Sequence, residues 1–95
     1  MLQANPIVFG NLRGTIYDCP ETDDILPMHN HDETTVHITV IARGSFKVRG
    51  EGWEMVSKAG DVIDWLPGQA HELIALEPNS RFVNLLKNTP DAKEL

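Results

Sequence analysis

Short runs of β-branched and aromatic residues, separated by turn-forming residues, recur along this chain. The most regular run is Thr34 to Ala42, TTVHITVIA, in which polar and apolar residues alternate. Alternation with a period of two is typical of a strand whose two faces have different neighbours. The pattern places one set of side chains on the interior face, Thr35, His37, Thr39 and Ile41, and another on the outer face, Val36, Ile38 and Val40.

Seven further runs have the composition of strands: 7–9, 15–17, 45–49, 53–57, 62–66, 70–76 and 81–86. Gly50-Glu51-Gly52 predicts a tight hairpin between two of them. Residues 18–27, with four acidic residues and two prolines, predict a loop. No segment has a helical period of useful length. Since seven Val, seven Ile and six Thr stand against six Ala, the sequence predicts an all-β protein.

Length, composition and charge exclude several classes of protein. The 95 residues suffice for one small domain, and 41% hydrophobic with 23% charged residues is a globular composition. A net charge of −6 makes nucleic acid and anionic membranes poor partners. The single cysteine, Cys19, excludes an intrachain disulfide and fits a reducing compartment. We find neither a signal peptide nor a long apolar run in the sequence, and we therefore expect a cytoplasmic protein.

Four histidines are the candidate chemistry. His29 and His31 are two residues apart and would leave the same face of a strand, and His37 keeps that face if the strand continues without a bulge. His71 lies in a distant run after a Pro-Gly turn. Imidazoles gathered on one face suit iron, zinc, nickel or copper. The alternative is that His29 and His31 belong to an exposed acidic loop.

The arrangement resembles the two motifs of the cupin superfamily. In the first motif two histidines surround one residue, as in His29-Asn30-His31, and a glutamate and a glycine follow; here His37 stands at the glutamate position and Gly44 at the glycine. The second motif is matched from Gly60-Asp61 through Pro67-Gly68 to His71. Both motifs occur in order, with 15 residues between Gly44 and Gly60. The resemblance implies a small antiparallel jelly-roll β-barrel.

The resemblance also divides the chain and implies a cofactor. Residues 1–24 would be N-terminal strands and a loop of the same domain, 25–87 the cupin core and 88–95 a polar C-terminal tail. The implied ligands of one divalent transition metal (Fe, Zn, Ni, Mn or Cu) are His29, His31, His37 and His71. Glu33 is an alternative ligand, and the alternative for His37 is a buried core imidazole. Four neutral imidazoles would leave the ion's charge uncompensated, which favours an anionic further ligand.

These residues are compatible with several functions. The metal would act on a small organic substrate or dioxygen; alternatively the domain is a non-catalytic module for a small ligand or metal, or it holds a structural zinc. The pocket for a small-molecule ligand would be lined by Thr39, Ile41, Ile63, Trp65 and Leu73, with Asp64 pointing to solvent. Arg43 and Arg81 would bind a substrate carboxylate or form exposed salt bridges. Cys19 is a loop or core residue.

The outer face of the best strand predicts a homodimer. Val36, Ile38 and Val40 would form a patch larger than a soluble monomer usually exposes. Pairing across a two-fold axis would bury it, and the N-terminal strand 7–9 could add to the partner's sheet. The alternative is that the chain's own N-terminal segment or a second sheet covers these side chains.

Overall fold

A computed structural model describes residues 1–10, 12–30 and 34–88, and of these the side chains of residues 9, 34, 35 and 88 are not described. His31, Glu33 and the tail residues 89–95 therefore lie outside the described residues, as does the side chain of Thr35. The described strands are β1 (Gln3–Phe9), β2 (Leu12–Cys19), β3 (Ile25–His29), β4 (Thr34–Arg43), β5 (Ser45–Gly50), β6 (Trp53–Lys58), β7 (Val62–Asp64), β8 (His71–Ala75) and β9 (Ser80–Asn88). The predicted all-β class is confirmed. None of the residues described forms a helix that could cross a membrane.

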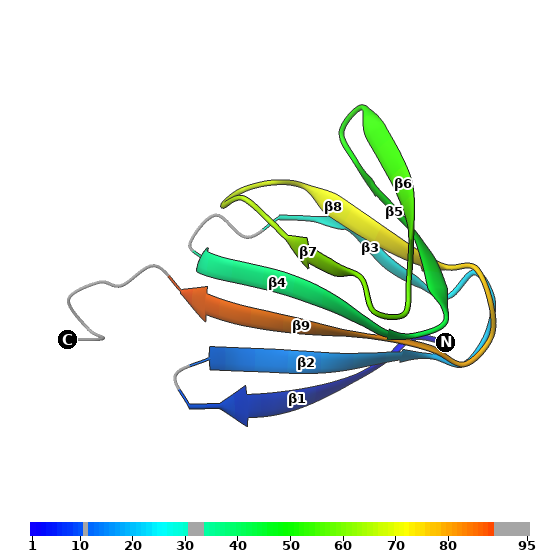
Figure 1. Cartoon of the computed structure of the whole chain (residues 1–95), viewed down its shortest axis with the longest axis horizontal. Coiled ribbons are helices and arrows are strands. Elements are labelled where there is room, and N and C mark those ends of the chain that lie inside the picture. The colour runs from blue at the N-terminus through cyan, green and yellow to red at the C-terminus, as the bar shows by residue number, and fades with distance from the viewer. Residues whose placement is uncertain (11, 31–33, 89–95) are drawn as a thin grey trace.

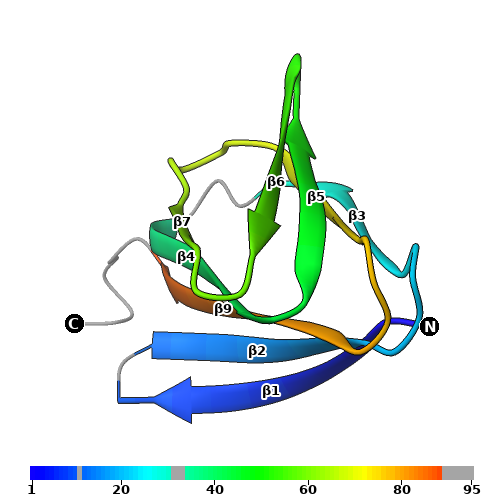
Figure 2. The same cartoon turned by 45° about the vertical axis from the view of Figure 1, so that its right-hand side comes forward.

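The strands form two antiparallel sheets that face each other (Figures 1 and 2). One sheet has the order β1-β2-β9-β4-β7, and the other has the order β3-β8-β5-β6. This is the predicted jelly-roll arrangement, but the predicted closure into a barrel is wrong, because no strand pairing joins the sheets in the described part of the chain. The edge strand β7 has only three residues, which leaves few backbone groups to pair across the gap.

The segment 18–27 is also more regular than its composition predicts. β2 continues to Cys19 and β3 begins at Ile25, which pairs with Ile74 of β8. Proline is tolerated in a strand at an edge or at a bulge, where no ladder hydrogen bond is lost. Pro27 meets both conditions, because β3 is an edge strand and its register shifts between Leu26 and His29.

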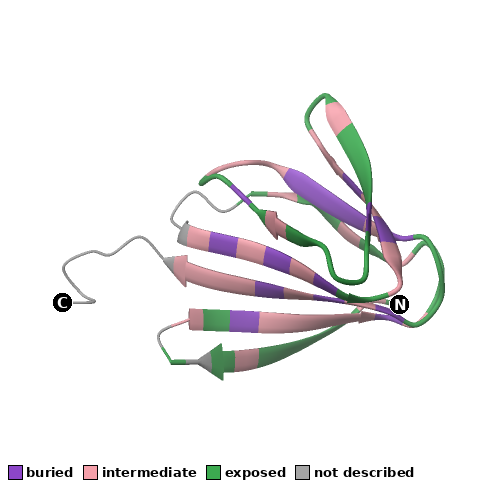
Figure 3. Cartoon of the chain, in the orientation of Figure 1, coloured by how far each residue is buried: buried purple, intermediate pink, exposed green. Residues whose placement is uncertain are grey.

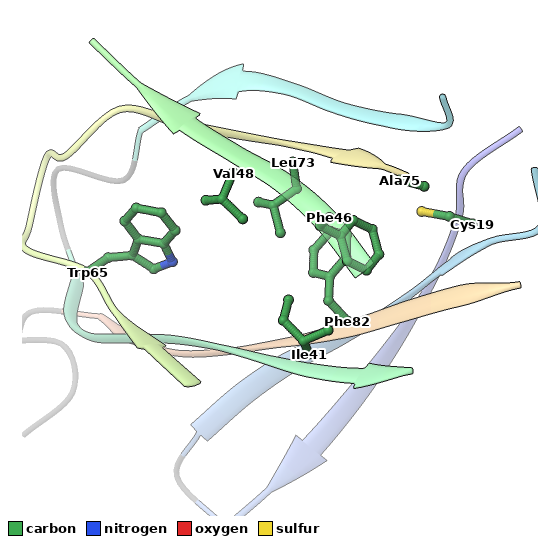
Figure 4. Close-up of a cluster of buried hydrophobic side chains, with 8 residues drawn as sticks. All are labelled: Cys19, Ile41, Phe46, Val48, Trp65, Leu73, Ala75 and Phe82. Carbon is green, nitrogen blue, oxygen red and sulfur yellow. The ribbon is translucent and has the colours of Figure 1, made fainter. Parts of the chain in front are cut away.

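The core lies between the two sheets and consists of eight buried apolar side chains, Cys19, Ile41, Phe46, Val48, Trp65, Leu73, Ala75 and Phe82 (Figure 4). Phe82 stacks on Tyr17 with ring centroids 4.8 Å apart and meets Phe46 edge-on at 5.1 Å. Burial alternates along β4, as Figure 3 shows. His37, Thr39 and Ile41 are buried, whereas Val36, Ile38 and Val40 are only half-buried, as the alternation predicts.

Candidate metal centre

Three histidines meet at one end of the sandwich, and they come from both sheets. His29 in β3 and His71 in β8 are opposed across one strand pair, with ring centroids 4.3 Å apart. His37, on β4 of the other sheet, has its ring centroid 4.7 Å from that of His71. The shared strand face considered for His29 and His37 does not exist, since β3 and β4 belong to different sheets. The rings approach one another across the interior.

Two of the rings are oriented by backbone carbonyls. The Nδ1 atom of His29 lies 2.7 Å from the carbonyl oxygen of Pro27, and that of His71 lies 2.8 Å from the carbonyl oxygen of Gln69. Because a carbonyl oxygen only accepts, each Nδ1 carries the hydrogen, and the lone pair of the neutral ring is on Nε2. Metal-binding histidines commonly have such a bond from the other ring nitrogen. The two histidines therefore present Nε2 as the donor atom toward a metal.

The rings of His37 and His71 are enclosed by the protein. Their exposed fractions are 2% and 0%, and the Nε2 atoms of both lie out of contact with solvent. His29 is half-buried. The cluster thus extends from the edge strand β3 into the interior, with its open side at His29.

Trp65 packs against the histidine cluster and connects it to two buried, hydrogen-bonded polar side chains. Its indole ring stacks on His71 with centroids 4.4 Å apart and an interplanar angle of 18°. The indole Nε1–H donates to Oγ1 of Thr39 at 2.8 Å, and the Thr39 hydroxyl donates to Oδ1 of Asn84 at 2.6 Å. The backbone N–H of Trp65 donates to the carbonyl oxygen of His37 at 2.9 Å. Trp65 is therefore held in contact with both histidines.

Asn84 is the residue of this site that the sequence analysis missed. It is 3% exposed and lies on β9, directly opposite Thr39 of β4. The available signal was its place two residues after Phe82 in a strand, which gives both side chains the same direction. Its partner could not be identified without the register of β4 against β9.

The residues predicted to line a pocket all point into the sandwich. Thr39 and Trp65 lie beside the histidines, and Ile63 is half-buried against the core. Ile41 and Leu73 are 1% and 0% exposed and belong to the packed core. Ile41 is four residues beyond His37, about 13 Å along the strand. Trp65 and Thr39 are accordingly the pocket candidates that contact the cluster.

Asp64, Arg81 and Arg43 do not belong to the histidine cluster. Asp64 is exposed, as predicted. Arg81 donates from Nε and NH2 to the two carboxylate oxygens of Asp18, at 2.6 and 3.1 Å, and Arg43 is 3.6 Å from the same carboxylate. Both arginines therefore form salt bridges, which was the alternative to binding a substrate carboxylate. They lie at the far end of β4 from His37.

The described donors are not preorganised as a metal site. Within residues 1–10, 12–30 and 34–88, no group of three or more His, Cys, Asp or Glu side chains is arranged to hold an ion. His31 and Glu33, the two remaining candidate ligands, lie outside these residues. The structure thus shows a histidine cluster with oriented rings.

Solved structures of other proteins have the same fold. KdgF from a Halomonas species superimposes with a TM-score of 0.80 at 21% identity, over 99% of this chain and 85% of that chain. A cupin 2 conserved barrel domain protein from Salinispora arenicola gives 0.79 at 18% identity, over 97% and 77%. The Cnp3 cupin domain of Schizosaccharomyces pombe gives 0.80 at 12% identity, over 98% and 67%. No protein-family model and no curated protein sequence matches this chain.

Proposed function

The chain has the cupin fold, and we propose that it binds one divalent transition metal through His29, His37 and His71, with His31 as the fourth ligand. The observation that carries the proposal is the meeting of three imidazoles from three different strands at one end of the sandwich. Imidazole is a common ligand for Fe, Ni, Cu and Zn.

The rings lie close enough together to approach a shared ion once their side chains rotate. Two imidazoles bound at right angles to one ion, each at a metal–nitrogen distance of ~2.1 Å, have ring centroids roughly 4.5 Å apart. The distances of 4.3 and 4.7 Å are close to this value, and the rings are inclined by 61° and 60° instead of being stacked. Because the described donors are not preorganised, binding requires rotation of side chains together with His31.

The chemistry of the donors indicates the class of ligand at the metal. A divalent ion held by neutral imidazoles keeps its full charge and acts as a Lewis acid toward a small organic anion, such as a carboxylate or an enolate. Trp65 covers one side of His71 and excludes water there. Thr39 and Asn84 fix the position of the indole through hydrogen bonds. These residues would shape the space beside the metal for a small organic substrate or ligand.

Metal analysis of protein purified without a histidine tag tests the proposal. We expect near-stoichiometric divalent metal, and we expect His31→Ala or His71→Ala to weaken binding roughly tenfold or more. His37→Ala should also lower occupancy, and His37→Glu should restore part of it by supplying a carboxylate ligand. Val56→Ala, an exposed position on β6, is the matched control. Full occupancy in the His31→Ala/His71→Ala double variant would contradict the site.

The identity and the effect of the metal separate the alternative functions. A ligand that binds only the folded state raises stability in proportion to its affinity and concentration. Stoichiometric zinc, with a large fall in melting temperature after chelation, would favour a structural site. Redox-active iron, with a small fall, would favour a site for a substrate or dioxygen. Turnover of a bound ligand would then distinguish an enzyme from a binding module.

A further inference from the structure

A polar hollow lies at the end of the five-stranded sheet that is remote from the histidines, on the side of the N-terminus in Figure 1. Its volume is about 280 Å³, and it is bordered by the ends of β1, β2, β4 and β9 and by the β8–β9 turn. Arg43 lies six residues beyond His37 on β4, about 20 Å along a strand. We call this site the arginine hollow, and its polar lining residues are Gln3, Asp18, Arg43, Asn79, Ser80 and Arg81.

The lining of the arginine hollow is positively charged, although the whole chain has a net charge of −6. Arg81 donates to both carboxylate oxygens of Asp18, and these two charges neutralise each other. The NH2 atom of Arg43 lies 3.6 Å from the same carboxylate, which is too far for a hydrogen bond. The two bases and one acid thus leave one unit of positive charge, and it is located on Arg43.

The guanidinium of Arg43 is held in place by the β8–β9 turn. Its Nε–H donates to the carbonyl oxygen of Asn79 at 2.6 Å. Asn79 has a left-handed backbone with a φ of 58°, which asparagine tolerates better than most residues. The N–H of Asn79 donates to the carbonyl oxygen of Pro20 at 3.1 Å, which fixes the turn. Because the Nε side of Arg43 is fixed in this way, its terminal NH1 and NH2 groups are the ones left to bind an anion.

Two side-chain amides complete the lining of the arginine hollow. Gln3 and Asn79 are exposed, and within residues 1–10, 12–30 and 34–88 their side-chain amides form no hydrogen bond with the protein. An amide has two donor hydrogens and an acceptor oxygen, so it can bind neutral polar groups of either kind. The hollow therefore combines one fixed cationic group with two uncharged groups that can donate or accept.

We propose that the arginine hollow binds a small organic acid, whose carboxylate pairs with Arg43 and whose neutral polar groups contact Gln3 and Asn79. A guanidinium binds a carboxylate through two parallel N–H···O bonds. One negative charge brings the lining residues to neutrality, whereas a phosphate dianion would leave an excess negative charge beside Asp18. The volume admits roughly nine non-hydrogen atoms if each occupies ~30 Å³, the share of a water molecule in the liquid. This binding does not depend on the proposed metal.

Titration of nitrogen-15-labelled protein with N-acetylglycine, followed by nuclear magnetic resonance at constant ionic strength, tests the proposal. This compound has one carboxylate and one amide, and N-acetylglycinamide is a neutral control of the same size. We expect saturable shifts of the Arg43 Nε–H and Asn79 side-chain signals, and at least tenfold weaker binding of the neutral control. These signals belong to the arginine hollow, so any binding at the histidines is seen separately. Equal affinities for the two compounds, or no saturable shift, would overturn the proposal.

Variants identify the groups that bind the acid. Arg43→Gln removes the charge that pairs with the carboxylate and should weaken binding at least tenfold. Gln3→Ala, which removes no hydrogen bond within the described chain, should weaken it several-fold. Lys58→Gln, at an exposed position of the other sheet, removes the same charge and is the matched control. Far-UV circular dichroism confirms that each variant is folded. Binding that survives Arg43→Gln, or that Lys58→Gln weakens equally, would overturn the site.

Asp18→Asn tests the argument from charge. Without this acid the lining residues carry two positive units instead of one. The variant should therefore prefer phosphate to N-acetylglycine in a competition at about pH 8, where phosphate is mainly a dianion. The wild-type protein should have the opposite preference. A wild-type protein that prefers phosphate, or a variant whose preference is unchanged, would overturn the assignment of the ligand as a carboxylate.

Discussion

The two halves of the sandwich interior differ in chemistry although the same strands run through both. Toward Cys19 the space is filled by Phe46, Phe82 and Ala75 (Figure 4). Toward Trp65 it holds histidines and a buried chain of hydrogen-bonded side chains. On β4 the change occurs within two residues, between Ile41 and Thr39. Apolar packing tolerates small errors of position, but each buried polar group needs a particular partner. The apolar half therefore supplies stability, and the polar half depends on register.

Cys19 shows how strongly the apolar half acts on a titratable group. Burial, with a smaller contribution from the negative charges of Asp24 and Asp18, raises the pKa of the Cys19 thiol to about 11. The thiol is therefore protonated at neutral pH and is a poor nucleophile. It is 1% exposed and packs as a small apolar side chain. Of the two expectations for this residue, loop or core, the structure supports the core.

The largest effect is expected from the apolar half. Phe82→Ala removes the contacts with Phe46 and Tyr17 and should lower the free energy of unfolding by about 3–5 kcal/mol. Metal content per folded molecule should be unchanged, since Phe82 is remote from the histidines along the sheet. Urea unfolding followed by circular dichroism measures the loss, with Val56→Ala as a surface control. A loss below about 1 kcal/mol would show that the core does not depend on this ring.

A smaller effect on stability, but one coupled to binding, is expected from the polar half. Thr39→Val keeps the shape of the side chain but leaves the Trp65 Nε1–H and the Asn84 Oδ1 without the hydroxyl between them. We expect a loss of about 1–3 kcal/mol and a several-fold weaker affinity for metal, because the indole is no longer fixed against His71. Thr39→Ser, which keeps the hydroxyl, should retain most of both.

Fluorescence of Trp65 in a Trp53→Phe background follows metal binding directly, because Trp65 stacks on His71. Equal affinities for metal in Thr39→Val and Thr39→Ser would mean that the hydroxyl has only a structural role. This outcome would leave the proposed metal ligands themselves unaffected.

The smallest effect is expected outside both halves, at the pair of Asp18 with Arg81. The hydrogen bond from Arg81 lowers the pKa of the Asp18 carboxyl in the folded state. A lowered pKa contributes stability above the unfolded-state value of about 3.9, and this contribution is lost as pH falls through the folded-state pKa. Asp18→Asn should therefore cost about 0.5–1 kcal/mol at pH 7, since the pair is partly exposed.

The cost of Asp18→Asn should shrink as pH falls below about 4, because the wild-type carboxyl is then protonated as well. Urea unfolding of both proteins at pH 7 and at lower pH measures the difference. A cost that does not change with pH would show that the charge of Asp18 is not the source of its stabilisation.

The features that the sequence predicted correctly are local. Alternation along β4 identified the buried and outer sets of side chains, and Gly50-Glu51-Gly52 located the hairpin between β5 and β6. The strand β3 was missed because Pro27 and the acidic residues before it favour a loop. What makes β3 a strand is its pairing with β8, a segment far along the chain. Such a pairing is not encoded in the composition of β3.

The candidate site was predictable only in part for the same reason. The motifs named all four histidines, and the structure brings three of them together. The chain from Trp65 through Thr39 to Asn84 links residues that are 26 and 45 positions apart. Alternation predicts that Thr39 points inward, but its partners depend on the register of β4 against β9 and on the path of the chain after β7. The sequence analysis therefore found the histidines of the cluster and missed the residues that support them.

The position of β9 in the five-stranded sheet has a consequence for how this protein is made. β9 is the last strand of the described chain, yet it lies between β2 and β4 and hydrogen-bonds to both. During synthesis on the ribosome, β2 and β4 emerge first and have no strand to join them. Their open edges are sites where nascent chains can associate wrongly. The larger sheet can therefore assemble only after synthesis has passed residue 88, and its contacts between distant segments make that assembly slow.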